Sequence, residues 1–239
     1  FEGNHVGGDG GGIRFRSEFG QLRIQGTWFA GNSGRYGGAV EVENFGSRNV
    51  FITDCTFTGN EAGLAGGGLA GPNSHLRLRN TIVQGNCAAP GAQNGQDVYV
   101  DGVGDVEAEC CCLERAGFNN PSRIIELGEQ VWSDPRFCAV GDCEENSGYD
   151  EAALSLAADS PCTPWNSPCS ELIGALGVQC SWNGLGACCL PDSCFMGTEA
   201  ECALASGSFL GEGSVCDSSA CQETPIEEST WGAIKALYR

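Results

Sequence analysis

FTGN, at Phe57–Asn60, is one of four short stretches in this chain that end in glycine and asparagine. The other three are FEGN, FAGN and VQGN, which begin at Phe1, Phe29 and Val83. Their asparagines are 28, 28 and 26 residues apart. A repeat of this length predicts a solenoid, in which each unit buries its apolar side against its neighbours.

Two further patterns recur in step with the asparagines. Glycine-rich stretches, GGGI, GGAV and GGGL, begin at Gly10, Gly37 and Gly66. The stretches LRIQGT, VFITDC and LRLRNT begin at Leu22, Val50 and Leu76 and align position for position. Because their apolar and polar residues alternate between bounding Gly and Asn residues, they predict half-buried β-strands joined by turns.

The asparagines Asn4, Asn32, Asn60 and Asn86 are expected to form a structural ladder along the solenoid axis. Stacked coils place equivalent residues about 4.8 Å apart, so each side-chain amide can bond to the coils above and below. Asn tolerates a left-handed turn, and the preceding Gly adopts a positive φ without a Cβ clash. Turn chemistry therefore explains these residues without a ligand.

The combination of FxxN with GGA(I/V/L) resembles the repeat of polymorphic outer-membrane proteins, within the pectin-lyase-like right-handed parallel β-helices. The resemblance covers residues 1–113 and predicts an all-β parallel β-helix of about four coils, the last of them degenerate. It implies a bacterial protein that is secreted or displayed on the cell surface. Since this fold hosts both enzymes and adhesins, it does not identify a function by itself.

The composition indicates an exported, acidic protein. The 239 residues include 16 cysteines but only 2 histidines, which favours disulfides formed in an oxidising compartment over zinc sites. The net charge of −19 would repel nucleic acid, and no apolar run reaches the about 18 residues that span a bilayer. We expect no cofactor. Calcium is a minor alternative, because neither Asp9 nor the pair Asp101 and Asp105 follows a known calcium-loop spacing.

The chain changes character after residue 113. Residues 114–181 contain SDPRFC, DSPC and LIGALG, which resemble the closing segment of secreted bacterial β-helix proteins and predict a cap on the open end of the solenoid. Residues 186–221 predict a small disulfide module, and residues 222–239 an acidic linker with a short tail, either a surface-attachment tag or a docked helix. Because the first coil begins in mid-repeat, we expect earlier coils and an export signal upstream.

Six cysteines define the module, and the sequence leaves their pairing open: Cys188, Cys189, Cys194, Cys202, Cys216 and Cys221. Elsewhere, short spacing suggests the pairs Cys138–Cys143 and Cys162–Cys169. Cys55 is expected to be a small buried residue, with a disulfide to Cys87 as the alternative.

Glu41 and Glu43 are the strongest candidates for catalytic carboxylates. They lie two apart on one strand and thus about 6.5 Å apart, which overlaps the spacing of an inverting glycosidase pair. The repeat alignment, however, places Arg14 beside Glu41 and Arg16 beside Glu43 on adjacent coils. Such cross-strand pairs contribute about 0.2–1 kcal/mol, and a neighbouring arginine lowers the pKa that a catalytic acid needs raised. Structural ion pairs therefore explain all four residues better.

A candidate carbohydrate-binding strip follows from the same alignment. Arg23, Phe51 and Arg77 fall in one outward row of successive coils, and Arg79 in the next row. An aromatic ring between two guanidinium groups can stack on them, and such a row can contact sugar faces or acidic uronates. The competing interpretation is a solvated face on which the arginine stems shield Phe51.

These observations favour a secreted or cell-surface, non-catalytic β-helix protein. It would act as a structural or adhesive scaffold that contacts polysaccharide or other cell-surface components. The alternative is a polysaccharide lyase or glycoside hydrolase of the pectin-lyase-like fold, which requires an exposed cleft with clustered Asp and an unpaired Arg or Lys. The ligand and the oligomeric state stay open.

Overall fold

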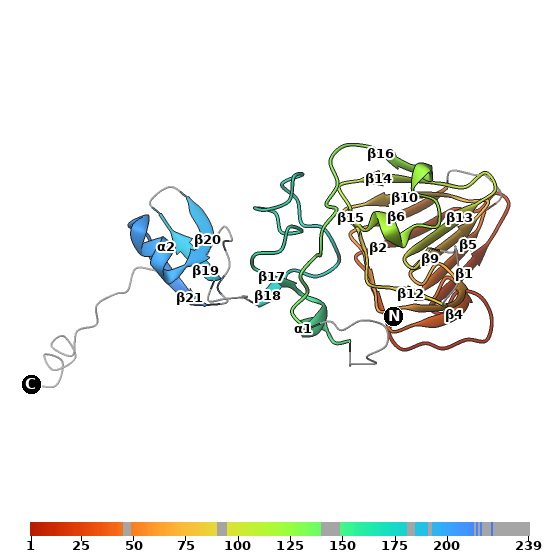
Figure 1. The fold of residues 1–239 in the computed structure, drawn as a ribbon, viewed down its shortest axis with the longest axis horizontal. Coiled ribbons are helices and arrows are strands. Elements are labelled where there is room, and N and C mark those ends of the chain that lie inside the picture. Colours follow the sequence, from red (N-terminus) through yellow and green to blue (C-terminus); the bar gives the residue numbers. More distant parts are fainter. Residues whose placement is uncertain are drawn as a thin grey trace, which may run out of the picture. The chain divides into compact units, whose positions relative to one another are not determined.

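A computed structural model describes residues 1–44, 49–89, 95–139, 149–180, 185–190, 193–212, 214, 216 and 221. The chain divides into two compact units, Phe1–Trp182 and Asn183–Arg239 (Figure 1). The tail expected at residues 222–239 lies outside the described residues.

The first unit is a parallel β-solenoid of about three turns. The first turn contains β1 (Ile13–Arg16), β2 (Leu22–Gln25), β3 (Trp28–Ala30) and β4 (Ser33–Tyr36). The second contains β5 (Val40–Glu43), β6 (Val50–Thr53), β7 (Thr56–Thr58) and β8 (Glu61–Ala65), and the third β9 (Leu69–Pro72), β10 (His75–Arg79), β11 (Ile82–Val83) and β12 (Cys87–Ala88). An incomplete turn follows with β13 (Val98–Asp101), β14 (Asp105–Glu109) and β15 (Cys112–Leu113). The predicted all-β parallel fold is thus confirmed.

Equivalent strands of successive turns stack into four parallel sheets, ordered β1-β5-β9-β13, β16-β14-β10-β6-β2, β15-β11-β7-β3 and β12-β8-β4, where β16 is Ile124–Glu126. Leu22 pairs with Val50, and Val50 with Leu76, in the register that the sequence alignment predicts. Val50 and Leu76 are buried in the solenoid interior, as their alternation with polar residues requires. Phe29 of β3 stacks on Phe57 of β7, its register partner, with ring centroids 4.7 Å apart.

The asparagine ladder is a directional chain of hydrogen bonds. Nδ2 of Asn4 donates to Oδ1 of Asn32, and Asn32 donates to Asn60 in the same way, both at 2.8 Å. Asn60 donates to Asn86 at 2.8 Å. The chain ends at Asp97, whose Oδ1 accepts from Nδ2 of Asn86 at 2.9 Å and from its backbone N–H at 3.0 Å. Each side-chain amide of the ladder therefore donates to the next coil, and the chain of bonds ends at a carboxyl oxygen of Asp97.

Stacking continues beyond residue 113. The 3₁₀ turns η1 (Arg115–Gly117) and η2 (Pro121–Arg123) lead into β16 (Ile124–Glu126), which pairs in parallel with β14. Phe118 belongs to the apolar core of the solenoid, and Trp132 packs against that core. Part of the segment predicted as a cap therefore adds to the stack itself.

The rest of the first unit packs against the side of the solenoid. It contains α1 (Glu151–Leu154), β17 (Leu156–Ala157) and β18 (Val178–Cys180). Trp28, Thr56, Ile82 and Cys112 are equivalent residues of successive coils and form what we call the outward row. Residues 172–176, the strap, lie along this row.

Three contacts fix the strap against the row. The backbone N–H of Ala175 donates to Oγ1 of Thr56 at 2.9 Å. Gly174 is so close to Ile82 that an added Cβ would lie 2.8 Å from the Cδ1 of Ile82. Ile173 shares a buried apolar cluster with Ile82. The strap therefore runs along the coils that carry Thr56 and Ile82.

The second unit is a small antiparallel sheet with one helix. Its strands are β19 (Leu185–Cys189), β20 (Cys194–Thr198) and β21 (Ser208–Glu212), in the order β20-β19-β21. The helix α2 (Glu199–Leu204) begins with a capping box, in which Thr198 and Glu201 each bond to the other's backbone N–H. The six module cysteines pair with one another as Cys188–Cys202, Cys189–Cys221 and Cys194–Cys216.

The pairings predicted from short spacing in the first unit are wrong. Cys138 bonds to Cys180, and Cys169 bonds to Cys110, because the chain folds back across the coils before these cysteines meet. Cys162 and Cys55 are buried free thiols, so the alternative disulfide of Cys55 is also wrong and its expected burial is confirmed.

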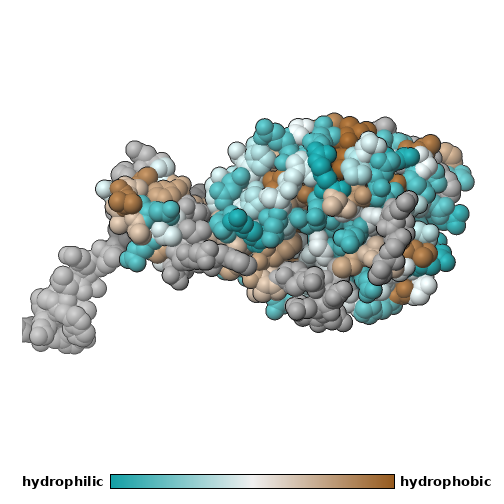
Figure 2. All heavy atoms as spheres, viewed as in Figure 1, coloured by the Kyte–Doolittle hydropathy of each residue, from teal (hydrophilic) through white to brown (hydrophobic). Residues whose placement is uncertain are grey.

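The visible surface is mainly hydrophilic, with hydrophobic residues in small separate groups (Figure 2). In the described part of the chain, no helix has the length and apolar character needed to cross a bilayer.

Candidate functional site

The outer face of the sheet β16-β14-β10-β6-β2 brings the predicted binding strip together. Cζ of Arg23 lies 4.6 Å from the ring centroid of Phe51, and Cζ of Arg77 lies 5.4 Å from it on the other side. The strand register sets this arrangement, since Phe51 pairs with Arg23 on β2 and with Arg77 on β10. We call these three residues the arginine–phenylalanine row. A half-buried ring held between two cations forms its centre.

Carboxylates continue this face on the next coil. Nε of Arg77 lies 2.7 Å from Oε2 of Glu107, its register partner on β14. Arg79 pairs in register with Glu109, and its Nη2 lies 3.6 Å from Oε1 of Glu171. The strip therefore carries guanidinium groups whose charge is balanced by neighbouring glutamates.

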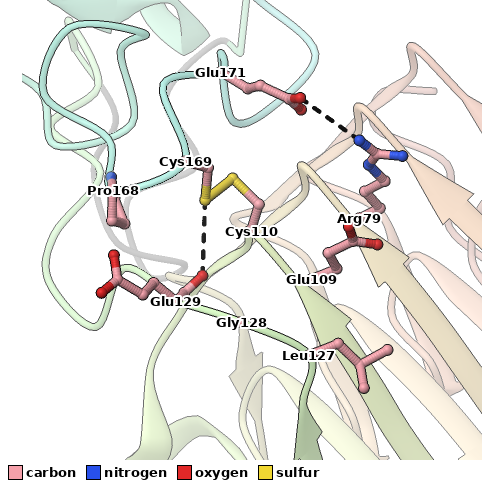
Figure 3. Close-up of a pocket in the computed structure, with 9 residues that line it drawn as sticks. All are labelled: Arg79, Glu109, Cys110, Leu127, Gly128, Glu129, Pro168, Cys169 and Glu171. Carbon is pink, nitrogen blue, oxygen red and sulfur yellow. Dashed lines mark hydrogen bonds and ion pairs between the residues drawn. A yellow bond between two sulfur atoms is a disulfide. The ribbon is translucent and has the colours of Figure 1, made fainter.

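A pocket of about 280 Å³ opens beside Arg79 (Figure 3). The side chains of Arg79 and Glu171 point toward each other at its rim, with Glu109 next to Arg79. The other lining residues are Glu129, the disulfide Cys110–Cys169, Leu127, Gly128 and Pro168. The volume is just below the range for small-molecule sites, about 300–1,000 Å³.

The disulfide gives this pocket a fixed wall. Cys110 adopts a positive φ of 52° at a coil corner, where Asp54 and Asn80 of the preceding coils adopt φ values of 54° and 46°. Its side chain leaves the corner and bonds to Cys169, which holds Glu171 close to Arg79. Nδ2 of Asn80 also donates to Oε2 of Glu171 at 2.6 Å. Residues from distant parts of the sequence are thus held in one place.

Glu41 and Glu43, on a different sheet, are ion-paired as the alignment predicts. Nε of Arg14 lies 3.4 Å from Oε2 of Glu41, and Nε of Arg16 lies 3.1 Å from Oε2 of Glu43. The side chain of Glu41 is only 5% exposed, so a polymeric substrate has little access to it. This pair has the arrangement of cross-strand ion pairs that fix register.

One argument made from the sequence is corrected by the structure. Burial raises the pKa of Glu41 above its usual value, and this outweighs the lowering by Arg14. The negative charge of Asp9 adds to the increase. A raised pKa in a covered ion pair reflects desolvation and does not identify a catalytic acid.

The aspartates considered for calcium have protein partners. Asp9 pairs with Arg14 at 3.1 Å and with Arg35 at 3.0 Å. Asp101 accepts from the hydroxyl of Tyr99 at 2.7 Å, while Asp105 lies 2.6 Å from Nδ1 of His75. In the second unit, the sulfur atoms of Cys189, Cys194 and Cys221 lie within 4.8 Å of one another, but all three are in disulfides and so offer no thiolate.

Sequence reasoning identified Arg79 but missed the glutamates around it. Glu109 follows from the repeat register, since it extends the row of Gln25, Thr53 and Arg79 by one coil. Glu129 and Glu171 carry no repeat signal, because they come from the segments that cover the solenoid. Comparison with protein-family models, with curated proteins and with solved structures finds no match to this chain.

Proposed function

We propose that this protein is a secreted, non-catalytic β-helix scaffold that binds carbohydrate on the outer face of the sheet β16-β14-β10-β6-β2. The observation that carries the proposal is the Phe51 ring between Arg23 and Arg77, next to a pocket rimmed by Arg79 and Glu171. An aromatic face stacks on the apolar face of a sugar ring, while guanidinium and carboxylate groups bond to its hydroxyls. Export is supported by the disulfides of both units.

The charge of this face favours a neutral glycan over an acidic one. Glu107 and Glu171 already balance Arg77 and Arg79, and the whole chain carries a net charge of −19. A uronate polymer would have to displace these ion pairs and approach a negative protein. Hydroxyl groups can instead bond to both members of each pair without separating them.

The resemblance to polymorphic outer-membrane proteins and the pectin-lyase-like fold supports a role at the cell surface, where a rigid stack of coils serves adhesion. The alternative function, a glycoside hydrolase or polysaccharide lyase, is favoured by one feature of the pocket. Glu109 and Glu171 bring two carboxylates to one cavity, and paired carboxylates are the machinery of glycoside hydrolysis.

A glycan array with matched arginine variants tests the binding proposal. We expect Arg77→Ala/Arg79→Ala to weaken binding of neutral glycans at least tenfold. The control is Arg14→Ala/Arg16→Ala, which removes the same charge from another sheet, together with the ion pairs to Asp9, Glu41 and Glu43, and should leave binding unchanged. Equal losses in both double variants, or no glycan binding by the wild-type protein, would refute the proposal.

The same glycans distinguish binding from cleavage. Release of new reducing ends or of unsaturated products from a bound polysaccharide, lost in Glu109→Gln/Glu171→Gln, would establish the enzyme instead. A scaffold leaves the polysaccharide intact, and this double variant changes only the affinity.

A further inference from the structure

Two buried thiols meet where the strap crosses the last coil of the outward row. Cys112, on β15, and Cys162 are both fully buried and both free. They belong to the same apolar cluster, together with Ile82, Ile173 and Leu156. Burial raises the pKa of the Cys112 thiol well above its usual value, and the neighbouring Cys162 thiol adds to this increase. Sγ of Cys112 donates to the backbone carbonyl of Ser133 at 3.3 Å. The two thiols therefore lie in the same buried cluster.

The fold explains why Cys162 lies at this place. The strap follows the outward row, with Ala175 bonded to Thr56 and Gly174 against Ile82. Ile173 is the next strap residue, and its backbone N–H donates to the carbonyl of Cys162 at 2.9 Å. Cys112 is the next member of the row after Ile82. The register of strap and row therefore brings Cys162 to Cys112.

The same two segments are already joined by one disulfide nearby. Cys110 lies two residues before Cys112, and Cys169 lies seven residues after Cys162. With Cys110 bonded to Cys169, the backbones around the thiol pair are held together. A second bond, nested inside the first, would link the same two segments of backbone.

We propose that Cys112 and Cys162 form a further disulfide that locks the strap onto the last coil of the outward row. The S–S bond forms as the two thiols lose two protons and two electrons. These pass to the disulfide of a small-molecule donor or an oxidoreductase, which is reduced to two thiols. The exchange takes place during folding, because the thiols are closed off once the strap has packed.

The other two buried thiols have a different role. Sγ of Cys55 donates to the carbonyl of Thr53 at 3.1 Å, and Sγ of Cys111 donates to that of Glu109 at 3.3 Å. At the equivalent corner, Oγ1 of Thr81 donates to the carbonyl of Arg79 at 2.7 Å. Cys55 and Cys111 therefore occupy positions equivalent to Thr81, where the side chain donates a hydrogen bond to the backbone at a coil corner. We expect both thiols to stay reduced.

Counting thiols in matched variants tests the proposal. Full-length protein, secreted into an oxidising compartment and purified without reductant, is denatured and alkylated, and the labels are counted by intact mass. Cys162→Ser should gain one label relative to wild type, because it releases Cys112 from the disulfide. The control Cys111→Ser should lose one label. If Cys162→Ser also loses one label, both thiols were free and the proposal is wrong.

A measurement on the wild-type protein makes the test independent of folding in the variants. A digest made without reductant should contain peptides linked through Cys112 and Cys162, assigned by fragmentation and lost on reduction. Absence of this linked species, with both cysteines found alkylated, would overturn the proposal.

Discussion

Replacing Asp97 with asparagine tests how the ladder ends. Oδ1 of Asp97 accepts both bonds from Asn86, and the residue is 1% exposed. An asparagine keeps the shape and the accepting oxygen but cannot ionise. The Asp97→Asn substitution therefore separates the hydrogen bonds of the ladder from the charge at its end.

The charge has a large and pH-dependent effect. Burial raises the pKa of Asp97 from 3.8 to about 7, although the hydrogen bonds from Asn86 lower it. Since the folded state holds this proton more tightly than the unfolded chain, the contribution to stability is full below pH 4 and is lost as the pH rises toward 7. At about 1.4 kcal/mol per pKa unit, the loss amounts to about 4 kcal/mol.

Guanidinium unfolding at a series of pH values, with the disulfides intact, measures this effect. We expect the free energy of unfolding of Asp97→Asn, relative to wild type, to increase by about 4 kcal/mol between pH 4 and pH 8. A difference in hydrogen bonding changes the free-energy difference between Asp97→Asn and wild type by the same amount at every pH. The dependence of that difference on pH therefore reports the effect of the charge. Asp134→Asn, at an exposed carboxylate, controls for the loss of one negative charge. A pH-independent difference between Asp97→Asn and wild type would refute the reasoning.

Two other changes have matched controls within the chain. The Cβ of Gly59→Ala would clash with the hydroxyl of Tyr149, whereas Gly26→Ala has a similar φ and nothing within 4 Å. In thermal unfolding, Gly59→Ala should therefore destabilise the protein by about 1–3 kcal/mol more than Gly26→Ala does. Equal effects would mean that Tyr149 moves aside freely. Phe29→Ala should cost about 3–5 kcal/mol, because the ring is fully buried and stacked on Phe57. Phe19→Ala, at an 88% exposed ring, should stay within about 0.5 kcal/mol, and a comparable loss there would contradict the burial argument.

The sequence predicted the solenoid and its register because each coil repeats the same local pattern. The alternation in Leu22–Gln25 and Val50–Thr53 sets which side chains face inward, and the asparagine spacing sets which residues are neighbours. The contact between Arg23 and Phe51 and the ion pair of Arg14 with Glu41 follow from that register alone.

Features without a repeat could not be predicted in this way. Glu171 reaches Arg79 only because the chain returns across the coils, and Cys169 meets Cys110 for the same reason. Asp97 ends the ladder from a position only 11 residues after Asn86, where the asparagine period no longer applies. The pocket thus depends on the path of the covering segments, which composition and spacing do not encode.

The strap also constrains how the length of this protein can change in evolution. Solenoids grow when one coil is duplicated, and a new coil adds about 4.8 Å to the stack. The strap has a fixed length and contacts the coils of Thr56 and Ile82, so a coil inserted between Thr56 and Cys112 would move Cys112 away from Cys162. A duplication before Trp28 leaves these contacts unchanged. We therefore expect natural length variants to differ in the coils ahead of Trp28, while the strapped coils keep a constant number.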